Sequence, residues 1–253
     1  MNSGPLSKIL RFLFSIYGIL VYLLFSTASL PFYFIIFSCF PAKKSPHTAH
    51  VVSRIVFRLF LSFFLIRIDI KGTEFVSSKK TYVFICNHRS LLDIPLAALS
   101  CKNTFRFLSK IELTKIPVMG YVIRKLYIAV DRSSKENRSK SFETMKKSIV
   151  DGISVFLFPE GTRNKTSNLL LDMREGAFRL AIETQTPIAI LTVLNSHELL
   201  PPSGLMALRP GTLHAIWSEP IETKGMSADD FQTLKTKAHR LMKDNLENYI
   251  SGR

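Results

Sequence analysis

The stretch Tyr-Val-Phe-Ile-Cys-Asn-His-Arg-Ser-Leu-Leu-Asp, residues 82–93, joins an apolar run to a His and an Asp that stand five positions apart. A short, continuous apolar run of this kind is typical of a strand buried on both faces. A His directly after such a strand can act as a general base near neutral pH, and a carboxylate can fix its tautomer. The stretch therefore predicts a buried strand followed by a candidate catalytic pair, His88 and Asp93.

Segments on both sides of this stretch alternate between strand and helix patterns. This alternation predicts an α/β fold with a mixed, mostly parallel sheet flanked by helices. The expected strands are 66–70, 82–86, 105–108, 127–130, 154–158, 188–193 and 212–217. The expected helices are 92–100, 116–125, 134–151, 176–184 and 228–249. Ser227 is the expected N-cap of the last helix, and Trp217 is expected in the core.

The spacing of His88 and Asp93 sets a condition on the local fold. In a straight helix, positions five apart are separated by about 140°, so the pair requires a strand-to-helix turn, for which Ser90 is a candidate N-cap. Ser90 and Cys86 are the nearest candidate nucleophiles, but the chain has no Gly-x-Ser-x-Gly sequence. The simplest mechanism therefore has His88 take a proton from a substrate hydroxyl. A structural His beside a carboxylate is one alternative, and a zinc pair is another, although no third ligand stands at suitable spacing.

A second polar cluster, Phe-Pro-Glu-Gly-Thr-Arg at 158–163, also follows an apolar run. Gly161 permits a turn, so that Arg163 projects from a loop at a strand end, where α/β proteins bind ligands. A guanidinium binds phosphate through two parallel hydrogen bonds. Glu160 is placed to orient Arg163 or to contact a substrate hydroxyl. An exposed Glu/Arg pair is the alternative for this cluster alone, but two such clusters favour a site for acyl transfer to a phosphate-bearing alcohol.

These two clusters resemble the first and third sequence blocks of the glycerolipid acyltransferase family. The remaining blocks and their lead-in are similar to segments 109–113, 117–120, 127–132 and 186–190. One departure is Leu191-Thr192, which stands where the family usually carries a second Pro. The resemblance covers residues 65 to 220 and includes four blocks in order, so it predicts the same chemistry for this chain.

The resemblance implies that His88 and Asp93 act on a thioester donor, either acyl-coenzyme A or an acyl carrier protein. It implies that the acceptor is the free hydroxyl of lysophosphatidic acid, which gives phosphatidic acid in phospholipid biosynthesis. The implied phosphate contacts are Arg163, Lys110 and Arg132, and the supporting residues are Asn87, Glu160, Gly161 and Thr162. No metal or cofactor is expected. Another lyso-lipid acceptor, a membrane-bound thioesterase or hydrolase, and a non-catalytic lipid- or nucleic-acid-binding protein remain alternatives.

Composition indicates a membrane partner. The 253 residues are 47% hydrophobic, include 20 Phe and carry a net charge of +15, which suits an anionic membrane or a nucleic acid. The aromatic residues cluster in apolar runs and do not alternate with basic residues, so no nucleic acid is expected as a partner. The three Cys form no metal spacing and indicate no oxidising compartment.

The N-terminal quarter of the sequence predicts how the chain meets the membrane. No charged residue lies between Arg11 and Lys43, and residues 12–42 as one helix would be about 45 Å long against a hydrocarbon core of about 30 Å. Basic residues flank both ends, which favours a segment that returns to one side over a single span. The expected domains are an anchor at 1–45, an amphipathic interfacial helix at 46–67 and a catalytic domain at 68–253. The basic stripe of that helix is His47, His50, Arg54 and Arg58, and an ordinary helix packed on the domain's core is the alternative. The expected location is the cytoplasmic face of a bacterial inner membrane.

Overall fold

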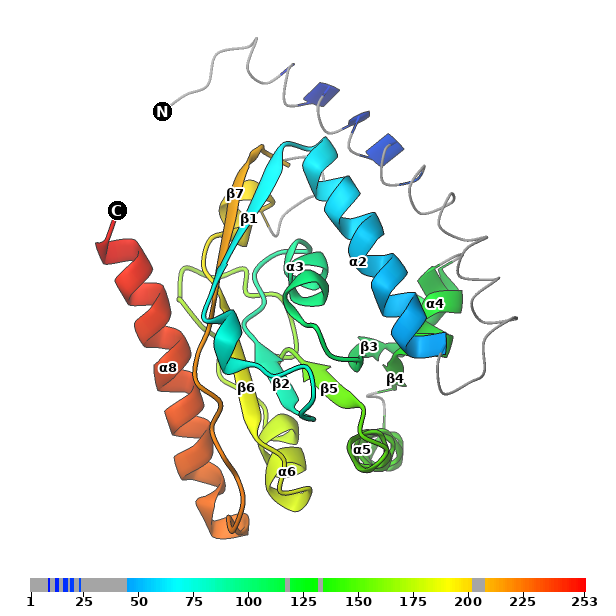
Figure 1. The fold of residues 1–253 in the computed structure, drawn as a ribbon, viewed down its shortest axis with the longest axis vertical. Helices are drawn as coiled ribbons and strands as arrows, with labels where there is room; N and C mark the ends of the chain where they lie inside the picture. Colours follow the sequence, from blue (N-terminus) through cyan, green and yellow to red (C-terminus); the bar gives the residue numbers. More distant parts are fainter. Residues whose placement is uncertain are drawn as a thin grey trace. The chain divides into compact units, whose positions relative to one another are not determined.

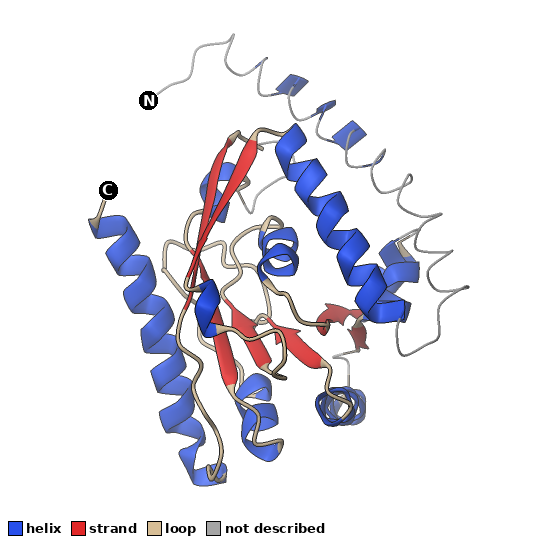
Figure 2. Cartoon of the chain, viewed as in Figure 1, coloured by secondary structure: helices blue, strands red, loops and turns tan. Residues whose placement is uncertain are grey.

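The computed structural model describes residues 45–116, 119–131, 134–201 and 208–253, together with residues 9, 12, 13, 16, 17, 19, 20 and 23. Within these ranges strands and helices alternate, and the α/β fold is confirmed (Figures 1 and 2). The strands are β1 Ile66–Lys71, β2 Val83–Cys86, β3 Phe105–Lys110, β4 Ile128–Val130, β5 Ser154–Leu157, β6 Ile188–Val193 and β7 Gly211–Trp217. Each coincides with an expected strand to within two residues at either end.

The helices follow the predicted pattern, with short additions. The α-helices are α2 Ser45–Phe63, α3 Asp93–Ser100, α4 Met119–Leu126, α5 Lys135–Val150, α6 Gly176–Glu183, α7 Ser196–Leu199 and α8 Phe231–Ser251. Short 3-10 helices in the described part of the chain are η1 Thr73–Phe75, η2 Ile111–Lys115 and η4 Ala228–Asp230. Ser227 caps η4 through a reciprocal capping box with Asp230, directly before α8, as the sequence predicts. The sequence reading missed α7, η1 and η2, which are all at most five residues long.

The seven strands form one sheet in the order β1-β7-β6-β2-β5-β3-β4. Strand β2 is parallel to both β5 and β6, and β3 is parallel to both β5 and β4. Strand β7 runs antiparallel to β6, so the expected mixed, mostly parallel sheet is confirmed. Because five parallel strands end at the same edge, the segments that follow β2, β3, β4, β5 and β6 begin at that edge.

The side chains of the central strands alternate between two chemically different faces. Aliphatic side chains of β2, β5 and β6 belong to the core shared with α5, α6 and α8: Val83, Ile85, Val155, Leu157, Ile188 and Ile190. Aromatic side chains fill the other face, where Phe84 stacks on Phe156 with ring centroids 5.8 Å apart and Phe107 contacts Phe156 at 5.0 Å. Trp217 is buried beside Phe84, as expected for a core residue. Burial on both faces explains why these strands are continuously apolar.

The chain forms two compact units, each assembled from separate segments. One comprises residues 1–69, 89–99 and 195–214, and the other comprises residues 70–88, 100–194 and 215–253. Residues 89–99 and 195–214 of the expected catalytic domain, 68–253, therefore belong to the unit that contains α2.

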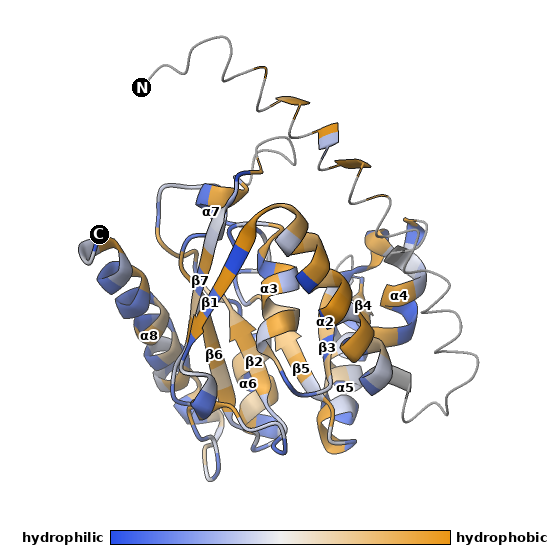
Figure 3. Ribbon diagram, turned by 45° about the horizontal axis from the view of Figure 1, so that its top comes forward, coloured by the Kyte–Doolittle hydropathy of each residue, from blue (hydrophilic) through white to orange (hydrophobic). Residues whose placement is uncertain are grey.

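Helix α2 differs from the expected interfacial helix in two respects. It ends at Phe63, before the expected residue 67, because Leu65 has a positive φ of 55° and β1 begins at Ile66. In addition, His50 is only 2% exposed, so the predicted basic stripe does not form one continuous exposed face. A row of apolar side chains spaced four residues apart is exposed instead: Val51, Ile55, Leu59 and Phe63. Figure 3 shows that α2 is mostly hydrophobic, whereas α8 is more hydrophilic.

The predicted anchor at residues 1–45 lies almost entirely outside the described residues. Those of its residues that are described include several exposed apolar side chains: Ile9, Phe12, Leu13, Leu20 and Leu23. Tyr17 stacks on Phe63 of α2 with ring centroids 5.2 Å apart. Among the described residues, no helix has the length and apolarity that a membrane crossing requires.

Candidate active site

Three segments with predicted site residues begin at the carboxyl edge of the parallel strands. His88 lies two residues after β2, Lys110 is the last residue of β3, and the segment 158–163 follows β5. The parallel pairing of these strands brings the three segments to one edge, although they are far apart in the sequence. Arg132, which follows β4, lies outside the described residues.

The backbone and ring of His88 are held by the segment after β5. The His88 N–H donates to Glu160 Oε1 at 2.8 Å, and the His88 carbonyl accepts from the Asn164 N–H at 2.6 Å. The imidazole stacks on the Phe158 ring with centroids 4.2 Å apart and an interplanar angle of 24°. The first and third sequence blocks therefore form a single structure around the candidate base.

Glu160 has a role that the sequence reading did not predict. Its carboxylate is 3% exposed, and its second oxygen, Oε2, accepts from the Leu171 N–H at 2.9 Å. The two carboxylate oxygens thus join the backbone at His88 to the backbone at Leu171. The contacts at its two oxygens fix the position of the His88 peptide, and the expected role of Glu160 in orienting Arg163 or contacting a substrate hydroxyl stays a prediction. Asn164 was also missed, because its contribution is a backbone N–H that carries no sequence signal.

Asp93 is the first residue of α3 and is fully buried. Its Oδ2 accepts from the N–H groups of Arg89 and Ser90, both at 2.8 Å, and the Ser90 hydroxyl accepts from the Leu92 N–H at 3.2 Å. This reciprocal arrangement resembles a capping box, so the predicted turn and the predicted cap at Ser90 are confirmed. The Asp93 Oδ1 accepts a hydrogen bond from the hydroxyl of Ser196.

The two candidate nucleophiles are engaged in structural contacts. The Ser90 hydroxyl donates to the Leu200 carbonyl at 2.7 Å. Cys86 is buried, and its Sγ donates to the Asn87 carbonyl at 3.1 Å. These contacts favour a mechanism without a covalent enzyme intermediate.

Asn87 extends the pairing of β2 with β6 by one step. Its Nδ2 donates to the Val193 carbonyl at 2.8 Å, and its Oδ1 accepts from the Val193 N–H at 2.8 Å. The carboxamide therefore takes the place of a backbone peptide at the end of the strand. This contact supports the site by fixing the point at which the chain leaves the sheet before His88.

The turn at Gly161 comes two residues before Arg163, the predicted phosphate-binding residue. Gly161 has a φ of 73°, and its N–H donates to the Phe158 carbonyl at 2.9 Å. Arg163 is half-buried, whereas Thr162 and Lys110 are exposed. The Arg174 side chain packs against the Gly161 Cα, where an added Cβ would lie 2.5 Å from Nε. Arg163, Lys110 and Arg174 form no ion pair within the ranges that the structure covers, so their positive charges are available to an anion.

Residues 67–193 match the protein family described as Acyltransferase, and this segment is half of the chain. The chain therefore belongs to the acyltransferase family. Among its relatives, a chloroplastic 1-acyl-sn-glycerol-3-phosphate acyltransferase from Brassica napus is 33% identical over 60% of this chain and 44% of its own length. A 1-acyl-sn-glycerol-3-phosphate acyltransferase from Haemophilus influenzae is 26% identical over 80% of this chain and 83% of its own length.

A second chloroplastic relative, from Arabidopsis thaliana, is 32% identical over 64% of this chain and 45% of its own length. The chain thus spans less than half the length of these two plant relatives. A solved structure of a 1-acyl-sn-glycerophosphate (LPA) acyltransferase from Thermotoga maritima superposes with a TM-score of 0.81. It is 21% identical in sequence, and the match covers 96% of this chain and 98% of that one, so the two proteins share a fold.

Proposed function

We propose that the protein transfers an acyl chain from a thioester donor to the free hydroxyl of lysophosphatidic acid, which gives phosphatidic acid. The observation that carries this proposal is the fixed position of His88, whose peptide is held by Glu160 and Asn164 and whose ring stacks on Phe158. A general base must be held in place if it is to meet its substrate proton in every turnover.

In the proposed reaction, His88 takes the proton from the acceptor hydroxyl, and that oxygen attacks the thioester carbonyl carbon. The new C–O ester bond forms, the C–S bond breaks, and the thiolate leaves with the proton that His88 returns. Asp93 orients the imidazole and balances the charge of the imidazolium. The structural contacts of Ser90 and Cys86 support direct attack by the acceptor over an acyl-enzyme route.

The proposed acceptor carries a phosphate that Arg163, Lys110 and Arg132 bind. Lys110 ends β3 and Arg163 follows β5, and these two neighbouring parallel strands end at the same edge of the sheet. The names of the relatives support a glycerol-3-phosphate headgroup. Other lyso-lipids remain alternative acceptors, and acyl-coenzyme A and an acyl carrier protein remain alternative donors. A thioesterase would use the same base on water but would leave Arg163 without a role.

The proposed location is the cytoplasmic face of a membrane, the bacterial inner membrane, where the lipid acceptor and the water-soluble donor meet. Support comes from the apolar sequence of residues 12–42, the net charge of +15 and the exposed apolar row on α2. A segment 1–45 that enters one leaflet, with α2 along its surface, suits basic flanks on both sides of the anchor.

The test is an assay of the purified protein with several lyso-lipids and both thioester donors. We expect His88→Ala to lower kcat by about 10²–10⁴-fold and Asp93→Asn to cause a large part of that loss. Arg163→Ala should raise KM for a phosphate-bearing acceptor more than for the donor, and Arg163→Lys should restore it only in part. Acyl release that is independent of any acceptor would refute the transferase in favour of a thioesterase.

A further inference from the structure

The short helix α7 lies against the turn that carries Asp93. The Ser196 hydroxyl donates to Asp93 Oδ1, and the Ser90 hydroxyl donates to the Leu200 carbonyl at 2.7 Å. All three side chains are at most 1% exposed. Two side-chain hydrogen bonds, one in each direction, therefore connect α7 to the turn over more than a hundred residues of sequence.

The position of Ser196 is itself fixed by the preceding residue. The Asn195 Nδ2 donates to the Thr212 carbonyl at 2.8 Å, and its Oδ1 accepts from the His214 N–H at 2.9 Å. Asn195 is buried, so its carboxamide joins α7 to the backbone of β7 in the same way that a neighbouring strand would. Ser196 thus donates from a rigid support rather than from a free loop.

Hydrogen bonds from Arg89, Ser90 and Ser196 reach both oxygens of the Asp93 carboxylate. Oδ2 accepts the N–H groups of Arg89 and Ser90, which belong to the turn itself, and these two bonds place that oxygen. Because the carboxylate is a rigid plane, these bonds already restrict its rotation about the Cβ–Cγ bond, and a hydrogen bond to Oδ1 restricts that rotation further. Ser196 supplies the hydrogen bond to Oδ1 from outside the turn.

We propose that Ser196 is a positioning residue that fixes the Asp93 carboxylate in the orientation in which it serves His88. This inference rests on the proposed function, in which Asp93 orients the base. Ser196 touches neither the acceptor nor the donor in this proposal, so its loss should change the rate of the chemical step and not the binding of substrates.

The experiment compares Ser196→Ala with Ser196→Thr and with a matched control, Ser148→Ala. Ser148 is also a buried serine, but its hydroxyl donates to the Thr144 carbonyl of its own helix at 3.0 Å. We expect Ser196→Ala to lower kcat about tenfold, the loss typical of one hydrogen bond to a charged group, with the acceptor KM within about twofold of wild type. Ser196→Thr, which keeps the hydroxyl, should recover most of that rate, and Ser148→Ala should retain the wild-type kcat.

The same substitutions in the Asp93→Asn protein separate this inference from the proposed function. If Ser196 acts through Asp93, Ser196→Ala should change the residual rate of Asp93→Asn by less than about twofold. Full activity of Asp93→Asn would refute the proposed dyad. An inactive Asp93→Asn beside a fully active Ser196→Ala would refute only the role of Ser196. A loss in Ser196→Ala that disappears when rates are divided by the folded fraction from circular dichroism would also refute it.

Discussion

At the scale of single residues, Gly161 meets two requirements at once. Its φ of 73° lies in the left-handed region, and an added Cβ would come within 2.5 Å of Arg174 Nε. Gly152 has a similar φ of 76° but no neighbouring atom within 4 Å of the same position. Substitutions at the two glycines therefore distinguish the cost of backbone strain from the cost of a steric clash with Arg174.

We predict that Gly161→Ala destabilises the protein more than Gly152→Ala. The backbone penalty of about 1 kcal/mol is common to both, and Gly161→Ala must in addition displace the Arg174 side chain. Urea unfolding of both variants measures the difference, and Arg174→Ala should reduce it. Equal destabilisation at the two glycines would show that the contact with Arg174 contributes nothing.

The sequence identified His88, Asp93 and the Gly161 turn as candidates, because each has a local signature. It did not identify the contacts that hold them. Glu160 binds the peptide of His88, and Ser196 binds Asp93, across 72 and 103 positions of sequence respectively. Such pairs depend on strand order, which no local pattern of residues contains.

At the scale of elements, too, features with a local sequence signature were predictable and features that depend on packing were not. The strands were predictable because apolar runs of four to six residues report burial directly. The exposed row of α2 was not, because His50 and Arg54 suggested a basic face and only packing decides which side of the helix is covered. Helix α7 is one turn long and gains its order from Asn195 and Ser196, so periodicity could not reveal it.

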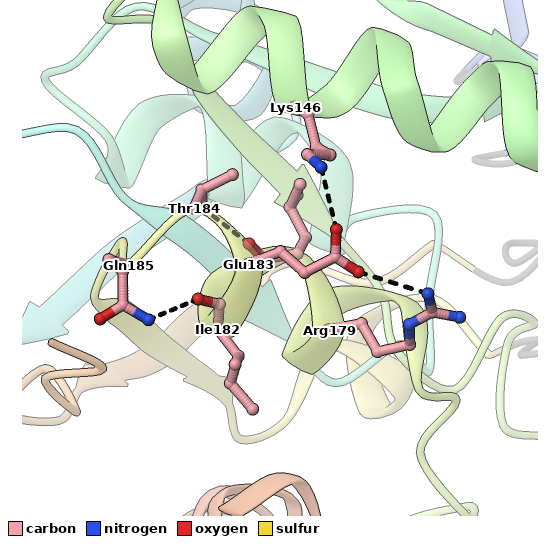
Figure 4. Close-up of polar contacts among 7 residues, drawn as sticks. Lys146, Arg179, Ile182, Glu183, Thr184 and Gln185 are labelled. Atoms are coloured by element: carbon pink, nitrogen blue, oxygen red, sulfur yellow. Dashed lines mark hydrogen bonds and ion pairs between the residues drawn. The ribbon is translucent and has the colours of Figure 1, made fainter. Parts of the chain in front are cut away.

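Helices α5 and α6 are connected by an ion-pair network centred on Glu183. Figure 4 shows its carboxylate between Lys146 of α5, at 3.0 Å, and Arg179 of α6, at 3.3 Å. The hydrogen bond from Lys146, followed by that from Arg179, holds the pKa of Glu183 below its ordinary value of 4.5 despite the opposing effect of burial. The hydrogen bond to Glu183 raises the pKa of Lys146 above 10.5.

These shifts predict a pH-dependent contribution to stability. The contribution of Glu183 is present above pH 4.5 and is lost as the pH falls through its lower folded-state pKa. That of Lys146 is present below pH 10.5 and is lost as the pH rises through its higher folded-state pKa. The stabilities of wild type and Glu183→Gln should therefore differ by a constant amount near neutral pH, and this difference should shrink at both extremes of pH.

Thermal unfolding between pH 3 and 11 checks this prediction. Glu136→Gln is the matched control, because Glu136 pairs with Lys140 while both side chains are at least 70% exposed, and such pairs contribute little. A difference between wild type and Glu183→Gln that persists unchanged below the folded-state pKa of Glu183 would contradict the assignment.

At the scale of the whole molecule, the proposed function requires contact with a lipid surface, and two features can provide it. The net charge of +15 attracts an anionic membrane over a distance of about one Debye length. The exposed row on α2 can bury apolar surface, at roughly 1.5–3 kcal/mol for each large side chain. Salt weakens the first contribution and leaves the second largely intact, so the two are separable by experiment.

We predict that the apolar row contributes more to membrane binding than the basic residues beside it. Ile55→Asp with Leu59→Asp should reduce binding to vesicles of mixed neutral and anionic lipid at least tenfold, at both low and high salt. Arg54→Glu with Arg58→Glu should reduce binding by about 1 kcal/mol per residue at low salt only. The control compares Ile55→Asp alone with Ile250→Asp, because each adds one aspartate and Ile250, on α8, is 56% exposed, against 55% for Ile55. Since each aspartate adds the same charge to a similarly exposed position, an equal loss of binding in the control would show that net charge, and not the apolar face of α2, brings the protein to the membrane.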